Sequence, residues 1–397
     1  MKASEATPRP GQARRRDGRT RWLLPFHGTV PLARRSLLRD RVRLAISVGA
    51  FGFAVLLVLL LRGIMDGTVA KSTTYIDRVG ADVFVSGPGV RNMALAASAL
   101  PASVVEELAG APGVQRSSGI LRMEVMASGP EAQMPAVLLG YEPGMSPGGP
   151  WELDRGRMLA SPGEAVVDSV LAGEIGAALG SPVQVGGKPL RVVGISAGTA
   201  ALAGKLLFVS LADAREILRM PDVVGFVLLK LSDGADASSV AEELGAAHPE
   251  LTVQTRAALS RNDRDVLSGL FVTPITMMSR VGLLVGLAIV GLTMYTTTAE
   301  RLRDFGVLKA MGAPSWYLFQ TVITQAVALG LAGFSFGVVA AVLAGPIIEG
   351  IAPEIGVEVR TMPAVLTLGE VLAMSLAGAI VPVARIIGVD PLIVFRR

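Results

Sequence analysis

The sequence predicts an α-helical membrane protein with four transmembrane helices and a large α/β extracytoplasmic domain inserted between helices 1 and 2. Hydrophobic residues make up 51% of the 397 residues and charged residues only 18%, whereas soluble domains usually carry about 25% charged residues. Four apolar stretches reach the roughly 20 residues that a helix needs to cross the hydrocarbon core of a membrane. They are residues 44–61, about 273–298, about 316–344 and about 363–384.

The order of these stretches predicts the domain organisation. The predicted segments are a basic cytoplasmic tail (1–29), an amphipathic inner-leaflet helix (30–43), transmembrane helix 1 (44–63), the extracytoplasmic domain (64–255), a stalk helix continuous with transmembrane helix 2 (256–298), a cytoplasmic coupling helix (299–315), transmembrane helix 3 (316–345), an external loop (346–362), transmembrane helix 4 (363–384) and a cytoplasmic tail (385–397). The interval between the first two apolar stretches is long enough for a folded domain.

The helical pattern that leads into the second apolar stretch is longer than a membrane is thick. Some forty residues span about 60 Å, twice the hydrocarbon thickness. Its polar first part, residues 256–272, should therefore stand outside the membrane as a stalk. We expect Arg261, Asp263 and Asp265 of this stalk to be accessible to water.

The distribution of basic residues predicts the orientation. Residues 1–43 contain twelve Lys/Arg and three Asp/Glu, so the net charge of +4 describes this one tail and not a nucleic-acid-binding surface. Basic segments stay in the cytoplasm. We therefore expect a multi-pass protein of the bacterial cell (inner) membrane, with both termini cytoplasmic and residues 64–270 extracytoplasmic. Neither nucleic acid nor a soluble compartment is implied.

The extracytoplasmic interval shows alternating strand and helix patterns. Strands are predicted at 81–86, 137–140, 164–168, 189–195, 205–210 and 223–231, and helices at 101–111, 169–180, 211–220 and 236–248. A Pro/Gly cluster at 143–150 is a candidate subdomain boundary. The chain has no cysteine, so its core must stabilise the domain without disulfides.

No catalytic, cofactor-binding or metal-binding residue is predicted. His27 and His248 fall on opposite sides of the membrane, so they cannot share a metal ion or a catalytic triad. The stretch GTAALAGKL (198–206) resembles a phosphate loop only superficially, because Leu206 stands where Ser or Thr should bind magnesium. We expect no enzymatic activity in this chain alone.

A charged island between the second and third apolar stretches reads ERLRDFGVLKAMGA (300–313). Apolar residues give it a helical face that water alone would not favour, and Gly312 and Pro314 end it before the next span. This motif resembles the corresponding loop of the MacB/FtsX-type permease family, the membrane subunits of type VII ABC systems. Asp304 replaces the glutamate that is usual there. The stretch 165–195 is similar to the family's periplasmic core pattern.

The resemblance implies a permease subunit without a fused ATPase domain. It couples ATP hydrolysis by a separate cytoplasmic ATPase to export or extracytoplasmic handling of an amphiphilic or hydrophobic client by mechanotransmission. Expected partners are that ABC ATPase, a second permease copy in a homodimer, membrane lipid and a periplasmic adaptor or other extracytoplasmic partner. No cofactor is expected in this chain, since ATP and Mg belong to the ATPase.

The resemblance also places ATPase coupling on the charged island. The implied coupling residues are Glu300, Arg301, Arg303, Asp304, Phe305, Gly306, Leu308, Lys309, Met311 and Gly312. We expect the side chains of Phe305, Leu308 and Met311 to insert into a groove of the ATPase. The charged residues should fix the register, and Gly306 should allow close backbone approach.

Two alternatives stay open at this stage. Arg280 and Glu370 interrupt predicted spans, and ionisable residues in a membrane are costly and usually paired or functional. They either form an intramembrane pair or reach the outer interface independently. The chain could also be a non-transporting mechanotransmitter that regulates an extracytoplasmic enzyme such as a cell-wall hydrolase. A sensor is a third reading, but no signalling domain accompanies the spans.

Overall fold

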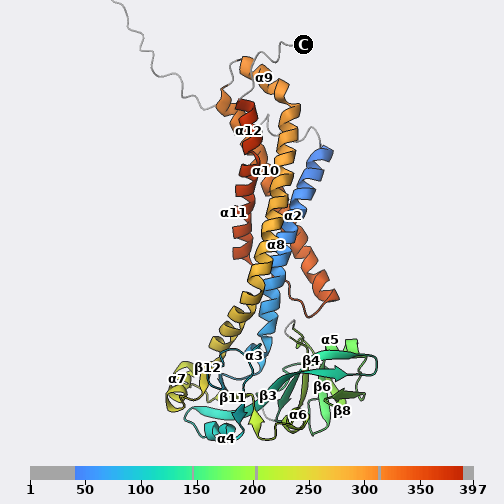
Figure 1. Ribbon diagram of the computed structural model, residues 1–397, viewed down its shortest axis with the longest axis vertical. Helices are drawn as coiled ribbons and strands as arrows, with labels where there is room; N and C mark the ends of the chain where they lie inside the picture. Colours follow the sequence, from blue (N-terminus) through green and yellow to red (C-terminus); the bar gives the residue numbers. More distant parts are fainter. Residues whose placement is uncertain (1–40, 145–146, 202–203, 312–313, 388–397) are drawn as a thin grey trace, which may run out of the picture.

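The computed structural model combines a bundle of long helices with an α/β domain at one end (Figure 1). It describes residues 41–144, 147–201, 204–311 and 314–387. The predicted tail 1–29, residues 30–40 of the predicted amphipathic helix, Gly312 and residues 388–397 lie outside the described residues.

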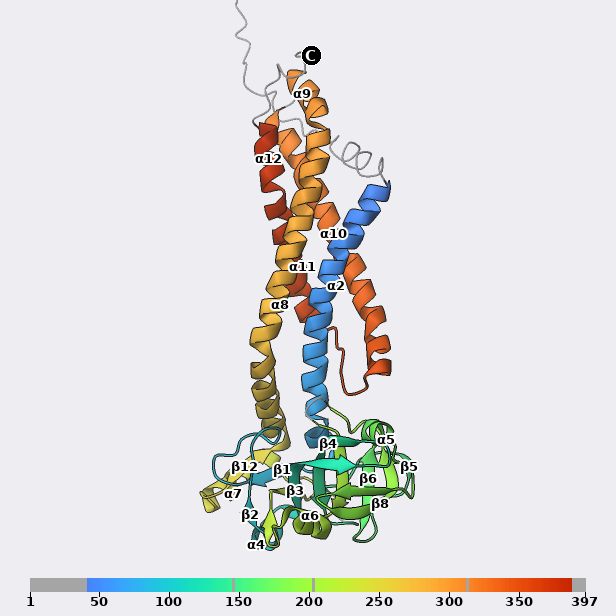
Figure 2. The ribbon, with the colours of Figure 1, turned by 45° about the vertical axis from the view of Figure 1, so that its right-hand side comes forward.

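Four helices of the described chain are long and apolar enough to cross a membrane, as predicted. The bundle consists of α2 (Arg41–Ser72), α8 (Arg256–Glu300), α10 (Ser315–Ile351) and α11 (Thr361–Gly378), which α12 (Ile380–Ile387) continues. Helices α2 and α8 extend side by side beyond the bundle to the α/β domain (Figure 2). As predicted, residues 256–298 belong to one continuous helix, since α8 runs for 45 residues.

The α/β domain lies between α2 and α8 in the chain. Its strands are β1 (Val83–Ser86), β2 (Leu100–Pro101), β3 (Val114–Ser128), β4 (Gln133–Tyr141), β5 (Leu153–Gly156), β6 (Glu164–Asp168), β7 (Pro182–Val185), β8 (Lys188–Ser196), β9 (Leu206–Ser210), β10 (Val223–Val224), β11 (Phe226–Leu231) and β12 (Thr252–Thr255). Its helices are α3 (Thr74–Arg78), α4 (Ser103–Ala109), α5 (Ser169–Ile175), α6 (Leu211–Leu218) and α7 (Ala237–Ala247). All predicted strands and helices of the domain are present.

The domain's main sheet has the strand order β12-β1-β11-β3-β4-β9-β6-β8-β5, and β7 pairs with β3 and β8. The long strand β3 holds the sheet together, because residues 114–120 pair with β11 and residues 121–128 pair with β4. The pairs β4–β9 and β6–β8 are parallel. Strands β3, β5, β7 and β12 were not among the predicted elements.

The sheet buries side chains on both of its faces. Along β4, Leu138 belongs to one hydrophobic cluster, whereas Val137 and Leu139 belong to a second. This alternation is the two-residue period of a strand. The second cluster includes Ile76 of α3 and Leu259 of α8, so the base of the stalk is part of the domain's core.

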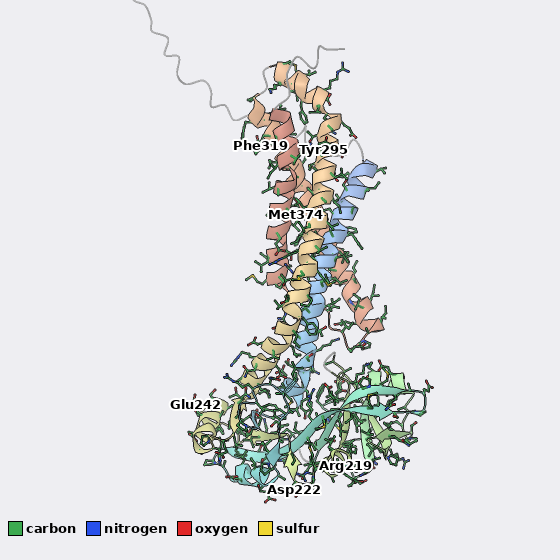
Figure 3. All side chains as sticks on the ribbon, in the orientation of Figure 1. Arg219, Asp222, Glu242, Tyr295, Phe319 and Met374 are labelled. Atoms are coloured by element: carbon green, nitrogen blue, oxygen red, sulfur yellow. The ribbon has the colours of Figure 1, made fainter. Side chains whose placement is uncertain are left out.

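The helical bundle has a core of its own. Phe51 of α2, Val290 of α8 and Met374 of α11 are buried in one cluster, and Met374 lies among the bundle helices in Figure 3. Small residues allow this packing. A Cβ added at Gly286 of α8 would lie 2.9 Å from the Met374 Cε atom.

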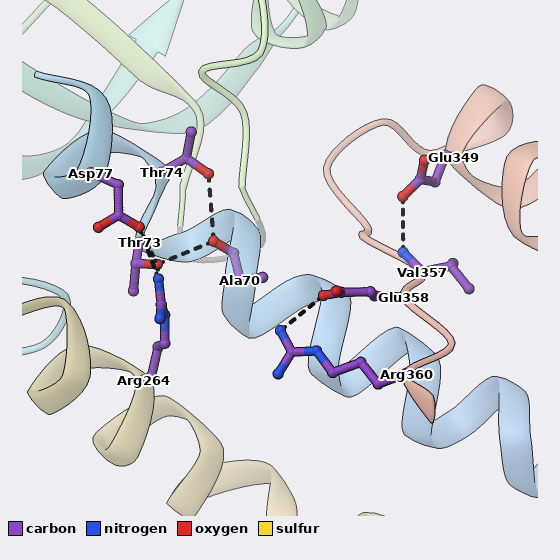
Figure 4. Close-up of polar contacts among 9 residues, drawn as sticks. All are labelled: Ala70, Thr73, Thr74, Asp77, Arg264, Glu349, Val357, Glu358 and Arg360. Carbon is purple, nitrogen blue, oxygen red and sulfur yellow. Dashed lines mark hydrogen bonds and ion pairs between the residues drawn. The ribbon is translucent and has the colours of Figure 1, made fainter. Parts of the chain in front are cut away.

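Polar contacts join the two stalk helices where they meet the domain (Figure 4). The Arg264 guanidinium of α8 donates hydrogen bonds to the Asp77 carboxylate of α3 (2.9 Å) and to the Thr73 hydroxyl (3.1 Å). The stalk residues Arg261 and Asp265 are exposed, as expected.

Asp263 is not accessible to water, which corrects the expectation from the sequence. Its side chain is 1% exposed and accepts a 2.6 Å hydrogen bond from the Met93 backbone N–H. The helical phase of α8 points this residue toward the domain, whereas Arg261 and Asp265 are exposed. Asp263 therefore attaches the loop before α4 to the stalk.

The loop between α10 and α11 lies along the half of α2 that is nearer the α/β domain. The Lys71 ammonium donates hydrogen bonds to the carbonyls of Pro353 and Ile355, both at 3.0 Å. Further along, the Glu358 N–H donates to the Gly63 carbonyl at 2.9 Å. The Glu349 carboxylate accepts from the Val357 N–H at the turn of the loop (Figure 4).

Two glycines bring the backbones of this loop and of α2 into direct contact. A Cβ added at Gly67 would lie 2.6 Å from the Gly356 carbonyl oxygen, which is closer than real Cβ contacts allow. A Cβ at Gly356 would likewise meet the backbone of Gly67. The α10–α11 loop and α2 are therefore closely packed at this point.

The environment of Asp263 predicts a dependence of stability on pH. Burial raises the pKa of Asp263 to about 6, although the N–H groups of Met93 and Ala94 and the charge of Arg122 oppose the shift. Because the folded pKa exceeds the unfolded one, Asp263 favours the folded state below about pH 4, and this contribution is lost as the pH rises through about 6. An Asp263→Asn variant should gain on the order of 1–3 kcal/mol of stability, relative to the parent, between pH 4.5 and pH 7.5.

Thermal unfolding of the full chain in a neutral detergent at the two pH values measures this gain. Asp265→Asn, on the exposed neighbour, provides the matched control, because it removes a carboxylate that is not buried. An Asp263→Asn effect that is the same at pH 4.5 and pH 7.5 would contradict the prediction.

The glycine contact predicts a position-specific effect of one methyl group. Gly67→Ala should lower the thermal unfolding midpoint, because overpacking costs about 1–3 kcal/mol and exceeds the gain of at most about 1 kcal/mol from replacing a helical glycine. Gly49→Ala on the same helix is the control, since nothing lies within 4 Å of an added Cβ there. Equal midpoints for the two variants would show that the contact is loose.

Candidate functional site

The charged island forms a short helix at the end of the bundle opposite the α/β domain (Figure 1). Helix α9 (Leu302–Ala310) is connected directly to α8 through Arg301 and leads into α10. Glu300 is the last residue of α8 and is exposed. The predicted coupling residues thus lie together at the turn between two long helices.

One face of α9 packs against the bundle. Phe305 is 7% exposed and belongs to the hydrophobic core of the bundle, and Leu308 packs against the same core. Gly306 is buried. This packing contradicts the expectation that the side chain of Phe305 inserts into a groove of a partner, because that side chain already anchors α9 to its own bundle.

The opposite face of α9 is exposed. It presents Arg303, Asp304, Val307 and Met311, with Val307 39% and Met311 71% exposed. The spacing of these residues is the one that places side chains on a single helical face. Arg301 and Lys309 are half-buried at its margins. Val307 was expected on the apolar surface of the island but not among the coupling residues, and the signal for including it was this spacing of three, four and seven residues.

The intramembrane charges are arranged differently from either expectation. Glu370 of α11 accepts a hydrogen bond from the Arg62 guanidinium of α2 at 3.0 Å, and Arg62 also donates to the Thr367 hydroxyl at 2.7 Å. Arg280 is exposed and forms no ion pair among the described residues. Arg62 directly follows the first apolar stretch, 44–61, and was not predicted as a partner of Glu370.

The loop that resembles a phosphate loop has a structural role. Thr199 donates a 2.5 Å hydrogen bond to the Asp168 carboxylate, which also accepts from the Val170 N–H at the start of α5. The loop leads into strand β9 and not into a helix whose N-terminus could bind phosphate. Among the described residues, no group of three or more His, Asp or Glu side chains could hold a metal ion.

Two family models match the chain. The MacB-like periplasmic core domain matches residues 44–247, which is more than half of the chain. The FtsX-like permease C-terminal domain matches residues 276–391, which include α9 and the last two long helices. The domain between α2 and α8 is thus an extracytoplasmic domain of the MacB type.

Curated relatives agree over almost the whole length. An uncharacterized ABC transporter permease of Mycobacterium bovis is 27% identical over 362 residues, which cover 89% of this chain and 95% of the relative. One from Mycobacterium tuberculosis is 27% identical over 369 residues, covering 90% and 97%.

A solved structure is also similar to part of the chain. It is the periplasmic region of MacB from Actinobacillus actinomycetemcomitans, with 18% identity and a TM-score of 0.37, covering 47% of this chain and 94% of that one. The two family models and the relatives that match almost the whole chain show the family. This chain belongs to the MacB/FtsX-type family of ABC transporter permeases.

Proposed function

We propose that this permease couples ATP hydrolysis by a separate cytoplasmic ATPase to export or extracytoplasmic handling of an amphiphilic or hydrophobic client by mechanotransmission. An ABC transporter permease implies such an ATPase partner. The observation that supports the coupling is the continuity of α8. Thr255 is both the last residue of β12 and the N-cap of α8, which continues unbroken to Glu300 beside α9.

Helix α9 is the docking element for the ATPase in this proposal. Its exposed face offers an apolar pair, Val307 and Met311, next to the charges of Arg303 and Asp304. An apolar centre with a charged margin is the usual composition of a protein interface. Phe305 and Leu308 hold the helix rigidly on the bundle, so that a force on α9 moves α8 and α10.

The second stalk helix receives the same motion through non-covalent contacts. Helix α10 follows α9 and packs along α2, and the α10–α11 loop contacts α2 again at Gly67. The Arg62–Glu370 pair joins α2 to α11 nearby. Both stalk helices would therefore transmit movement from α9 to the extracytoplasmic domain.

A second copy of the permease is proposed to pack against α8. Of the four spans, α8 is the least covered, with 17% of its most apolar stretch buried against 33–39% in the others. Leu284 and Leu292 are each about two-thirds exposed on it. Lipid covers the apolar side chains that the homodimer leaves exposed.

The proposed topology is testable with single cysteines, since the chain has none of its own. Asp265→Cys, on the exposed part of the stalk, should react with a membrane-impermeant maleimide in intact spheroplasts. Asp304→Cys, on the exposed face of α9, should react only after permeabilisation. The reverse pattern would invert the orientation and remove α9 from the reach of a cytoplasmic ATPase.

The docking face predicts which substitutions separate the two subunits. Val307→Asp should remove the ATPase from the purified permease and lower ATP-dependent activity at least tenfold, because a carboxylate would be desolvated at the interface. Permease yield should not fall, since Val307 packs against no core. Val307→Leu is the matched control and should retain the ATPase.

Leu308→Asp places the same charge on the opposite face of α9 and so tests whether any charge on this helix has the effect of Val307→Asp. Leu308 packs against the bundle core, so its substitution should lower permease yield itself. If the Val307→Asp permease co-purifies with a full complement of ATPase and has normal activity, the exposed face of α9 is only a connector.

A further inference from the structure

A cavity lies where the stalk meets the extracytoplasmic domain. It has a volume of about 50 Å³, and its walls come from α3, β3, β4 and α8, including Tyr75, Arg122, Leu139 and Asp263. A larger space of about 300 Å³ adjoins it, because Val137 lines both. Ala201 and Gly204 also line both spaces, and Glu354 of the α10–α11 loop lines the larger one, so the two neighbouring spaces are together called the cleft.

A half-buried guanidinium faces this cavity without an acceptor. Arg122 of β3 forms no hydrogen bond or ion pair among the described residues, and burial lowers its pKa. Its neighbours of opposite charge are Asp263 and Glu124. Asp263 is engaged by the Met93 N–H, and Glu124, two residues along the strand, is exposed and lines the larger space. Burying a cation without a partner lowers the stability of a fold. Such a residue therefore suggests a role other than stabilisation.

A second donor without a partner lines the same cavity. The indole N–H of Trp151 is buried and has no acceptor among the described residues. The Trp151 ring lies 6.4 Å from the ring of Tyr75, whose hydroxyl already donates to the Gly148 carbonyl. Both donors that lack an acceptor, Arg122 and Trp151, therefore line a cavity whose aromatic wall is held in place.

The rest of the lining is part apolar and part charged, because Glu124, Lys205 and Glu354 also line the larger space. Ile76 and Leu139 of the domain core line the smaller space, and Pro135, Ala136 and Val137 of β4 line the larger one. The Lys71 ammonium lies at the edge of the smaller space, where the carbonyls of the α10–α11 loop engage it. The two donors, Arg122 and Trp151, and the apolar residues of β4 therefore line the same cleft.

We propose that this cleft binds an amphiphile by its anionic oxygen group, a carboxylate or a phosphate, with Arg122 as the main contact and the apolar body lying along β4. The inference rests on the proposed function, since it names the class of client. Such a ligand would contact α3, α8 and the sheet together. Its occupancy would thereby be coupled to the angle between stalk and domain.

The experiment uses Trp151 as a reporter inside the cavity. Trp22→Phe and Trp316→Phe leave it as the single tryptophan of the full chain. The purified permease, in a neutral detergent, is titrated with octyl phosphate, octanoate, inorganic phosphate and octyl glucoside. We expect a saturable change in Trp151 fluorescence with octyl phosphate, octanoate or both, and at least tenfold weaker binding of inorganic phosphate and octyl glucoside.

Substitution of the guanidinium tests the contact itself. Arg122→Gln should weaken binding of the anionic amphiphile at least tenfold without lowering the thermal unfolding midpoint, because it removes an unpaired cation. Arg116→Gln, on an exposed residue of the same strand, should bind as the parent does. Should Arg122→Gln be unstable, Arg122→Lys keeps the charge and should bind with intermediate affinity.

The titrations with octanoate and octyl phosphate also identify which anionic group the cleft binds. Binding of octanoate alone assigns a carboxylate, and binding of octyl phosphate alone assigns a phosphate. Equal affinity for octyl glucoside, or unchanged affinity in Arg122→Gln, overturns the proposal. Equal affinity for inorganic phosphate overturns the role of the apolar body. The titration needs no ATPase, so its failure leaves the coupling proposed for α9 intact, and failure of the Val307 test leaves this site intact.

Discussion

The continuity of α8 is the constraint on which the rest of the structure depends, although Pro274 within it has no N–H to donate. In a membrane every backbone N–H and C=O must be satisfied within the chain, so a spanning segment is helical and stiff. Here the helix does not end at the membrane surface. Its 45 residues extend about 68 Å at 1.5 Å per residue, and the first of them follows β12 directly. In the proposed mechanism, a movement at α9 would thus reach the edge of the sheet through α8.

The two stalk helices are attached to the domain in different ways. Helix α8 enters the sheet covalently and is joined to α3 by the Arg264–Asp77 pair. Helix α2 leads into α3, while packing and hydrogen bonds tie it to the α10–α11 loop. The junction is also rich in polar groups, among them Asp263 and Arg122.

Local patterns accounted for most of the fold. Every predicted strand and helix of the domain is present, because each has an apolar run or a helical period of its own. Strand β3 escaped prediction for a physical reason. Its first half pairs with β11 and its second with β4, so the residues 114–128 change environment midway and show no single period. Strands β7 and β12 have four residues each and exist through their neighbours' hydrogen bonds.

The sequence by itself determined the four spans, the inserted domain and the position of the short helix α9. Each span must be long and apolar enough to cross the membrane, and both properties are visible in the local sequence. Only the tertiary structure decided that Glu370 pairs with Arg62, 308 residues away, and not with Arg280. It also turned Phe305 inward and Val307 outward, since a short helix can present either face until its neighbours fill one side. Contacts between distant segments set these choices, and no local pattern encodes them.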